Sequence, residues 1–354
     1  MTLQNPNIKA FVKLGEFLRH FCKSVRHDES MDGINEAWFL KFDHTLETAR
    51  HHNGWFTKEN LLFALEQWGM ALSAEHLELW LSTYDLSKNT TKRVALILAG
   101  NIPLVGFHDL LTVLVTGNTA VVKLSSNDTL LLPLLVDYLI HVHPDFKERV
   151  LFTKDRLTDF DAVIATGSNN TARYFEYYFG KKPNIIRKNR NSVAVLSGAE
   201  SDIALAALGE DIFRYYGLGC RSVSKLFVPK GYNFDAFFTA QFPNNQIIHQ
   251  HKYANNYDYN KAVYLMSEFK ILDNGFLMLK EDASYASPIA TVFYEEYDTL
   301  ETIKARIETE KDVIQCVVSN GLFPNEVPFG KTQTPELWDY ADGVDTVEFL
   351  LRTS

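Results

Sequence analysis

The pattern of apolar and polar residues changes near residue 93 and divides the chain into regions of different structure. Before that point, apolar residues recur with the spacing of amphipathic helices. The first run, IKAFVKLGEFLRHF, places four large apolar residues on one helix face, namely Phe11, Leu14, Phe17 and Leu18. Thr57 and Ser73 precede two further helical runs and are suitable N-cap residues. The pattern therefore predicts a helical region over residues 1–90.

From residue 93 onward, short apolar runs alternate with segments of helical spacing. The predicted strands are RVALILAG, NTAVVKLS, RVLFT, FDAVIATGS, PNIIRKN and SVAVLSG. The predicted helices between them are NIPLVGFHDLLTVLVTG, DTLLLPLLVDYLIHVHP and NNTARYFEYYFG. This alternation predicts an α/β fold with an open, mostly parallel sheet and helices on both of its faces. Ligands of such sheets bind at the carboxyl ends of the strands, which here carry the turns GNIP, KLSS and ATGS.

A second α/β unit follows, and its boundary is predicted near residue 216. The segment SDIALAALGEDIFRYY predicts a helix, GLGC a turn, SVSKLFVP and SPIATVFYE two strands, and DTLETIKARIETE another helix. The final run, VDTVEFLL, predicts a short strand. Between the two longer strands lies an aromatic, asparagine-rich stretch, FPNNQIIHQHKYANNYDYNKAV, which could line a substrate channel or form a surface loop.

Composition excludes several classes of protein. The chain has 354 residues, of which 46% are hydrophobic and 22% charged, as in a globular protein of one large or two smaller domains. The formal net charge of −9 argues against a general nucleic-acid binder. The cysteines, Cys22, Cys220 and Cys316, have neither zinc-ligand spacing nor the pattern of a disulfide framework, which favours a reducing compartment. With no secretory signal or long uncharged apolar segment in the sequence, we expect a soluble, cytoplasmic protein.

Cys220, in the turn GLGCRS, is the candidate nucleophile. Cysteine is often a small buried hydrophobe, and residue type alone favours that structural role. The neighbouring residues favour chemistry instead, because Gly217 and Gly219 allow the backbone to approach a ligand and Arg221 could stabilise a thiolate. The thiolate is the nucleophilic form of cysteine.

Three turns at the predicted sheet edge hold further candidates. Asn101 follows the first strand, where its amide could stabilise an oxyanion or only satisfy the turn. Lys123 ends the second strand, where it could reach a ribose or phosphate group or only face solvent. Gly167 and Ser168 begin a helix whose N–H groups could bind a phosphate, although the dinucleotide fingerprint G-x-G-x-x-G is absent. His108 is expected to be a packed helix residue.

Together and in order, these segments resemble the aldehyde dehydrogenase superfamily. The residues that carry the resemblance are GNIPL, LVTGNTAVVKLSS, ATGSNNTAR, NRNSVAVLSGAESD, GLGCRS and SPIATVFYEEYDTLETI, spanning roughly residues 93–305. They are similar in turn to W-N-F-P-L, A-x-G-N-x-V-V-x-K-P-S-E, F-T-G-S-x-x-x-G, G-G-K-S-P-x-I-V-x-x-D-A-D, G-Q-x-C and G-P-V-x-P-V-x-x-F-x-x-x-D-E-A-I. The resemblance implies an aldehyde dehydrogenase-like α/β fold, with a Rossmann-type cofactor domain and a second α/β catalytic domain.

Departures from the superfamily pattern point to its acyl-CoA reductase branch, the LuxC-type fatty-acyl reductases. The glutamate that serves hydrolytic members as a general base aligns with Arg187, and a guanidinium cannot accept a proton from water at neutral pH. The glutamate that binds the nicotinamide ribose aligns with Ser284. The glutamate that holds the adenosine ribose is replaced by Ser126, which removes repulsion against a 2′-phosphate and favours NADPH, with NADH as the alternative.

The resemblance implies reduction of an acyl-CoA, or of an acyl-protein thioester, to the aldehyde by NADPH. Cys220 would form the acyl-enzyme, while the Asn101 amide and the Cys220 N–H would hold the oxyanion. The implied cofactor-binding residues are Lys123, Ser125, Ser126, Gly167 and Ser168. The implied domains are a helical region at 1–90 packed on the cofactor domain, an NADP(H)-binding domain at 91–215, a catalytic domain at 216–330 and a C-terminal return segment at 331–354. The resemblance also implies a homo-oligomer.

Two alternatives to this function stay open from the sequence. A related activated-acyl reductase, such as one acting on an acyl phosphate, would use the same cysteine and the same hydride step. A degenerate member acting as a non-catalytic partner subunit would explain the lost ribose-binding carboxylates, but the retention of Asn101, Lys123 and Cys220 counts against it.

Overall fold

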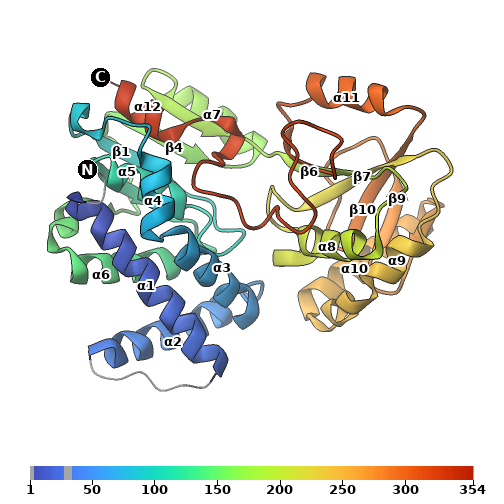
Figure 1. The fold of residues 1–354 in the computed structure, drawn as a ribbon, viewed down its shortest axis with the longest axis horizontal. Helices are drawn as coiled ribbons and strands as arrows, with labels where there is room; N and C mark the ends of the chain where they lie inside the picture. Colours follow the sequence, from blue (N-terminus) through green and yellow to red (C-terminus); the bar gives the residue numbers. More distant parts are fainter. Residues whose placement is uncertain (1–3, 28–33, 354) are drawn as a thin grey trace. The chain divides into compact units, whose positions relative to one another are not determined.

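The computed structural model describes residues 4–27 and 34–353, which form two compact units. Unit 1 comprises Met1–Lys188 with Glu336–Ser354, and unit 2 comprises Asn189–Pro335. Each unit contains its own sheet, and Figure 1 follows the chain through both in sequence colours. No helix within the described ranges is long and apolar enough to cross a membrane.

Within the described residues, four α-helices precede the first strand of unit 1, and all but the second coincide with the runs of helical spacing in the sequence. They are α1 (Pro6–His27), α2 (Ile34–His52), α3 (Lys58–Ala71) and α4 (Ala74–Leu81). Thr57 and Ser73 are the N-caps of α3 and α4, where their side chains accept hydrogen bonds from the N–H groups of Asn60 and His76. The predicted apolar face of α1 is buried in the main core of unit 1.

Sheet A of unit 1 is parallel, with strand order β3-β2-β1-β4-β5. Its strands are β1 (Arg93–Ile97), β2 (Thr119–Lys123), β3 (Val150–Phe152), β4 (Ala162–Thr166) and β5 (Asn184–Arg187). The helices between them are α5 (Phe107–Val115), α6 (Leu131–Val142) and α7 (Asn169–Phe179). Along β1, Val94 and Leu96 face a core shared with α1, α5 and α6, whereas Ala95 faces a core shared with α7. Helices therefore cover both faces of the sheet, which confirms the predicted α/β architecture.

The C-terminal run predicted as a strand is instead a helix, α12 (Thr346–Arg352). Asp345 caps this helix, because its carboxylate accepts a hydrogen bond of 2.8 Å from the N–H of Glu348. Val347 and Leu350, one helical turn apart, are both fully buried in the core of unit 1. The capped start and the burial at helical spacing outweigh the strand preference of the β-branched residues in this run.

Sheet B of unit 2 has strand order β11-β6-β7-β10-β9-β8 and is parallel except for the β8–β9 pair. Its strands are β6 (Asn191–Val195), β7 (Val223–Pro229), β8 (Ile271–Asp273), β9 (Met278–Glu281), β10 (Thr291–Tyr297) and β11 (Ile314–Val318). Its α-helices are α8 (Asp202–Phe213), α9 (Asp235–Gln241), α10 (His251–Met266) and α11 (Leu300–Thr309). α8 and α11 contribute to two different cores, one on each face of the sheet.

The division between the units falls at residues 188 and 189, ahead of the boundary predicted near residue 216. β6 pairs with both β7 and β11, so residues 189–215 belong to sheet B rather than to sheet A. The functions assigned to the predicted domains stay predictions.

The aromatic, asparagine-rich stretch is helical rather than a loop. It forms a 3₁₀ segment (Phe242–His249) and most of α10, whose buried residues are Tyr253, Tyr257 and Tyr264. The other short 3₁₀ segments are Leu86–Lys88, Pro144–Glu148, Arg214–Gly217 and Ala341–Gly343. The segment Arg214–Gly217 leads from α8 into the turn that contains Cys220 and therefore bears on the candidate site.

Candidate functional site

Unit 1 brings three of the predicted turns to one edge of sheet A. β1 lies between β2 and β4, and Ile97 is level with Lys123 on one side and with Ala165 on the other. Because the three strands run parallel, the turns that follow them lie at the same carboxyl edge; these turns contain Asn101, Lys123–Ser126 and Gly167–Ser168. The structure thus gathers the unit 1 candidates at one sheet edge, while their roles stay predictions.

The turns after β1 and β2 are in direct contact. A Cβ atom on Gly100 would lie 2.7 Å from Cβ of Ser125, so a residue with a side chain would force the two turns apart. Asn101, the next residue, is exposed. Leu104 has a left-handed backbone, with φ of 58°, and its N–H donates to the carboxylate of Asp128 at 3.4 Å. Burial raises the pKa of Asp128. These contacts fix the path of the GNIPL turn and so the position of Asn101.

The residues at the end of β2 offer donors to solvent. The ammonium of Lys123 donates a hydrogen bond of 3.3 Å to the carbonyl of Asp155. Ser126 is exposed, and its carbonyl oxygen lies 3.0 Å from Nε2 of His52. An ammonium group beside serine hydroxyls can donate to ribose or phosphate oxygens.

Gly167 and Ser168 begin α7. The Ser168 hydroxyl accepts a hydrogen bond of 3.2 Å from the N–H of Thr171 and therefore caps the helix. A Cβ atom on Gly167 would lie 3.0 Å from the ring of Phe175, so a larger residue would crowd the turn. The Ser168 side chain is engaged in capping, which leaves the backbone N–H groups and the helix dipole as the means of binding an anion here.

Arg187, at the end of β5, is part of a buried ion pair. Its guanidinium donates hydrogen bonds of 2.6 and 2.8 Å to the two carboxylate oxygens of Asp109 on α5. The side chains are only 8% and 4% exposed. According to the family resemblance, Arg187 occupies the position of the general base of hydrolytic members. In this chain the residue is a cation that joins β5 to α5.

His108 is a packed helix residue. Its Nε2 atom lies 2.8 Å from the carbonyl oxygen of Leu337, and its ring packs beside those of Trp80 and Tyr340. Burial lowers the pKa of His108, so the folded protein favours the neutral imidazole. These contacts account for the residue without a catalytic role.

In unit 2, Cys220 lies in an exposed turn that follows a strained backbone. Three consecutive residues after α8 are left-handed, with φ of 54° at Tyr215, 59° at Tyr216 and 75° at Gly217. Glycine adopts this conformation readily, but two adjacent tyrosines do so only where the surroundings impose it. Cys220 is exposed, whereas Cys22 and Cys316 are buried. Of the cysteines, Cys220 alone is therefore placed to react with a substrate.

Several hydrogen bonds hold the turn of Cys220. The N–H of Ser222 donates to the carbonyl of Gly219 at 3.0 Å, and the hydroxyl of Ser192 on β6 donates to the carbonyl of Cys220 at 3.0 Å. Nε of Arg221 donates to the carbonyl of Thr332 at 2.5 Å. The turn is therefore fixed through its backbone and through Arg221, which leaves the Cys220 side chain exposed.

The segment that receives Arg221 is itself held by a buried carboxylate on α8. Asp211 accepts hydrogen bonds from the N–H groups of Gly330 and Thr332, at 2.6 and 2.9 Å, and from the Thr332 hydroxyl at 2.8 Å. Burial raises the pKa of Asp211, while these donors oppose that rise. Protonating Asp211 would weaken the support of the Cys220 turn.

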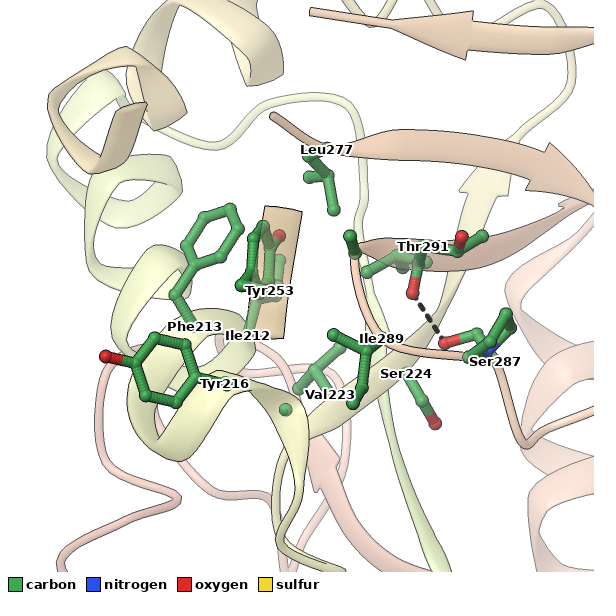
Figure 2. A pocket seen from close by; sticks show the side chains of 14 residues that line it. Ile212, Phe213, Tyr216, Val223, Ser224, Tyr253, Leu277, Ser287, Ile289 and Thr291 are labelled. Atoms are coloured by element: carbon green, nitrogen blue, oxygen red, sulfur yellow. Dashed lines mark hydrogen bonds between the residues drawn. The ribbon is translucent and has the colours of Figure 1, made fainter. Parts of the chain in front are cut away.

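Beside this turn lies a small hollow that is partly open to solvent, here called the unit 2 hollow. It is lined by the end of α8, the start of β7, Tyr253 of α10, and the segments that lead into β9 and β10. Figure 2 shows the rings of Phe213, Tyr216 and Tyr253 gathered on one side, facing Ile289 and Thr291.

The sequence did not indicate the unit 2 hollow. Its walls come from residues 212–224 and 277–292, which meet only in the folded chain, and the left-handed tyrosines carry no sequence signal. Ser284, which aligns with a ribose-binding glutamate, is exposed, and its N–H donates to the carboxylate of Asp282 at 2.8 Å.

Comparison with protein families gives one match, to the family described as acyl-CoA reductase (LuxC), over residues 35–252. These residues include Asn101, Lys123 and Cys220. Among curated proteins, no match is found.

Solved structures with a similar fold are aldehyde dehydrogenases. Aldehyde dehydrogenase C of Pseudomonas syringae, a mutant in complex with NAD⁺ and octanal, is 13% identical, with a TM-score of 0.60 over 89% of this chain and 72% of that one. Aldehyde dehydrogenase 21 of Physcomitrella patens, in complex with succinate, is 11% identical, with a TM-score of 0.62 over 98% and 87%. The aldehyde dehydrogenase of Mycobacterium tuberculosis, in complex with NAD⁺, is 13% identical, with a TM-score of 0.60 over 89% and 73%. At sequence identities this low, the structural similarity establishes the fold alone.

Proposed function

Because this chain belongs to the LuxC acyl-CoA reductase family, we propose that it reduces an acyl-CoA, or an acyl-protein thioester, to the aldehyde with NADPH. It is an enzyme of the acyl-CoA reductase type with an aldehyde dehydrogenase-like α/β fold. The observation that supports the proposal most directly is the family match over residues 35–252, because it spans the exposed Cys220.

The donors at the edge of sheet A fit a nicotinamide dinucleotide. Lys123, Ser125 and Ser126 offer an ammonium and two hydroxyl groups at the end of β2, and Gly167 precedes the start of α7. Two of the similar solved structures are complexes with NAD⁺, which supports a cofactor of this class. Serine rather than glutamate at position 126 leaves a 2′-phosphate unopposed by a carboxylate at this position, and we therefore propose NADPH.

The proposed reaction begins with the thiolate of Cys220. It attacks the thioester carbonyl carbon, the bond from that carbon to the CoA sulfur breaks, and CoA leaves as a thiol after gaining a proton. The amide of Asn101 and the N–H of Cys220 donate hydrogen bonds to the carbonyl oxygen as it becomes negative. When bound, NADPH supplies a hydride to the carbonyl carbon of the acyl group on Cys220. The carbonyl then re-forms, the bond to the cysteine sulfur breaks, and the aldehyde leaves with the Cys220 thiolate restored.

Arg187 explains why we propose reduction rather than hydrolysis. An acyl-cysteine is hydrolysed when a general base activates water beside it. In this chain the residue aligned with that base is a guanidinium in a buried ion pair with Asp109, and it cannot accept a proton. The acyl-enzyme would therefore persist until hydride transfer.

The test compares Cys220→Ala with Cys316→Ala, which changes a buried cysteine instead of the exposed one. NADPH oxidation is followed with acyl-CoAs of increasing chain length, and intact mass is measured after incubation with acyl-CoA alone. We expect an acyl adduct on the wild type and on Cys316→Ala that NADPH removes, and neither adduct nor turnover for Cys220→Ala. Normal turnover by Cys220→Ala would contradict the mechanism. A wild type that takes no adduct at any chain length would favour the non-catalytic alternative.

A further inference from the structure

We infer that Asp211 is a positioning residue for Cys220. Its carboxylate fixes residues 330–333, here called the 330–333 segment, and this segment holds the two residues that follow Cys220 in its turn. The inference rests on the proposed function, because the position of Cys220 affects the rate only if its thiolate attacks the substrate. It gives a role to a buried carboxylate that the proposed mechanism does not use.

Asp211 is a buried charge held by donors from one distant segment. It is fully buried on α8 and accepts hydrogen bonds from the N–H of Gly330 at 2.6 Å and from the N–H and hydroxyl of Thr332 at 2.9 and 2.8 Å. A carboxylate loses its hydration on burial and persists there only with such donors. Leu208 and Ile212 on the same helix are apolar core residues. An apolar residue at 211 would serve packing alone, whereas the carboxylate specifies where the 330–333 segment lies.

The backbone of the 330–333 segment lies against α8 at Gly330. This residue is left-handed, with φ of 79°, and a Cβ atom on it would lie 3.2 Å from both Cβ and the carbonyl oxygen of Ala207. Any other residue would be strained in its backbone and crowded by the helix. The close approach and the three hydrogen bonds to Asp211 act on the same few residues, so together they set the position of the segment relative to α8.

The same segment holds the turn of Cys220 through two side chains. The carbonyl of Thr332 accepts a hydrogen bond of 2.5 Å from Nε of Arg221, and the amide of Gln333 donates one of 3.4 Å to the hydroxyl of Ser222. Thr332 and Gln333 are both buried. Thr332 bonds to α8 through its N–H and hydroxyl and to Arg221 through its carbonyl, which makes it the link between the helix and the turn.

Cys220 depends on this support because its side chain is exposed. A side chain packed in a core is fixed by its neighbours, whereas the direction of an exposed one follows mainly from its backbone. Attack requires the reacting atoms to be about 3–3.5 Å apart and aligned, and a misplacement of about 1 Å can lower the rate about 100-fold. The N–H of Cys220, the proposed oxyanion donor, would move together with the sulfur. Loosening the 330–333 segment should therefore slow acyl transfer.

The test compares Asp211→Asn with Leu208→Ala. Asparagine has nearly the shape of aspartate, but its NH₂ group would face an N–H group that the carboxylate now accepts. Leu208→Ala is the matched control, because Leu208 is fully buried on the same helix and its truncation leaves a cavity in the core of unit 2. The readouts are kcat and the KM for NADPH, from NADPH oxidation with acyl-CoAs of increasing length from acetyl-CoA upward. Urea unfolding followed by circular dichroism gives the stability of each variant.

We expect Asp211→Asn to lower kcat about 10–100-fold, the range for a small displacement of the nucleophile. The KM for NADPH should not change, because the proposed cofactor-binding residues belong to unit 1. Leu208→Ala should lose stability and keep the kcat of the wild type. Asp211→Asn should also cost less in an Arg221→Ala background than in the wild type, because residues of one hydrogen-bond network are not additive. The same cost in both backgrounds would overturn the route through Arg221.

The outcomes separate the inference from the proposed function. If the wild type reduces acyl-CoAs and Asp211→Asn keeps its kcat, or Leu208→Ala loses as much, then Asp211 does not position the nucleophile and the proposed function stands. If the wild type reduces no acyl-CoA of any length, the proposed function fails and the inference with it. Should Asp211→Asn fail to fold, Thr332→Val decides. That variant removes the hydroxyl that bonds to Asp211, and an unchanged kcat in it overturns the inference.

Discussion

Replacing Arg187 by methionine is expected to cost unit 1 about 3–5 kcal/mol of its free energy of unfolding, the usual effect of removing one partner from a buried ion pair. The guanidinium joins β5 to Asp109 on α5 by hydrogen bonds of 2.6 and 2.8 Å, and lies 3.5 Å from the hydroxyl of Thr346 on α12. Three elements of unit 1 therefore meet at this one side chain.

The magnitude follows from burial. Exposed ion pairs contribute about 0–1 kcal/mol, because water screens them and long side chains lose entropy. Arg187 and Asp109 are 8% and 4% exposed, so methionine at 187 would leave a carboxylate charge with neither water nor a cation beside it. The double variant Arg187→Met/Asp109→Leu removes both charges and should recover most of the loss. Lys188→Met is the matched control, since Lys188 pairs with Glu176 on the surface, where the side chains are 53% and 50% exposed.

The assay is urea unfolding followed by tryptophan fluorescence. All of the tryptophans lie in unit 1, namely Trp38, Trp55, Trp68, Trp80 and Trp338, so the signal reports on that unit. The reasoning is refuted if Arg187→Met unfolds within about 1 kcal/mol of the wild type, the value for an exposed pair. A double variant as unstable as the single one would refute it equally.

Three further substitutions test the cofactor and catalytic assignments and the packing of the histidine. Asn101→Ala should lower kcat about 10²–10³-fold, the usual effect of losing one oxyanion donor, and an unchanged kcat would remove Asn101 from the mechanism. Ser126→Glu should lower the ratio of kcat/KM for NADPH to that for NADH, because a carboxylate repels the 2′-phosphate; an unaltered ratio would place the adenosine ribose elsewhere. Burial lowers the pKa of His108 below its ordinary value of 6.5, so the unfolded state alone gains a proton as the pH falls through 6.5. Stability should therefore decrease on acidification, and His108→Gln should show a shallower decrease in denaturant unfolding at pH 7 and pH 5.

The central strands of unit 1 were predictable because both of their faces are buried, so that nearly all of their residues are apolar. β1, β2 and β4 are central strands of a parallel sheet with helices on both faces, so they appear in the sequence as nearly unbroken apolar runs. The N-caps Thr57 and Ser73 were predictable for a local reason, since a capping side chain acts within three residues.

The features that the sequence did not predict depend on contacts between distant residues. α12 resembles a strand in its composition, and its helical form depends on the cap at Asp345 and on the burial of Val347 and Leu350. The division at residues 188 and 189 depends on the pairing of β6 with β7 and β11, which no local pattern specifies. The unit 2 hollow needs the end of α8 to meet the segment before β10.

Arg187 also limits how the acyl-enzyme chemistry could change. By the resemblance, Arg187→Glu would restore the general base of the hydrolytic relatives. In this chain the same change would place a second carboxylate beside the buried Asp109, where two negative charges without water would repel each other. That substitution should therefore unfold unit 1 before it could support hydrolysis. Because the ion pair joins β5 to α5, a general base at position 187 would require a change of Asp109 as well.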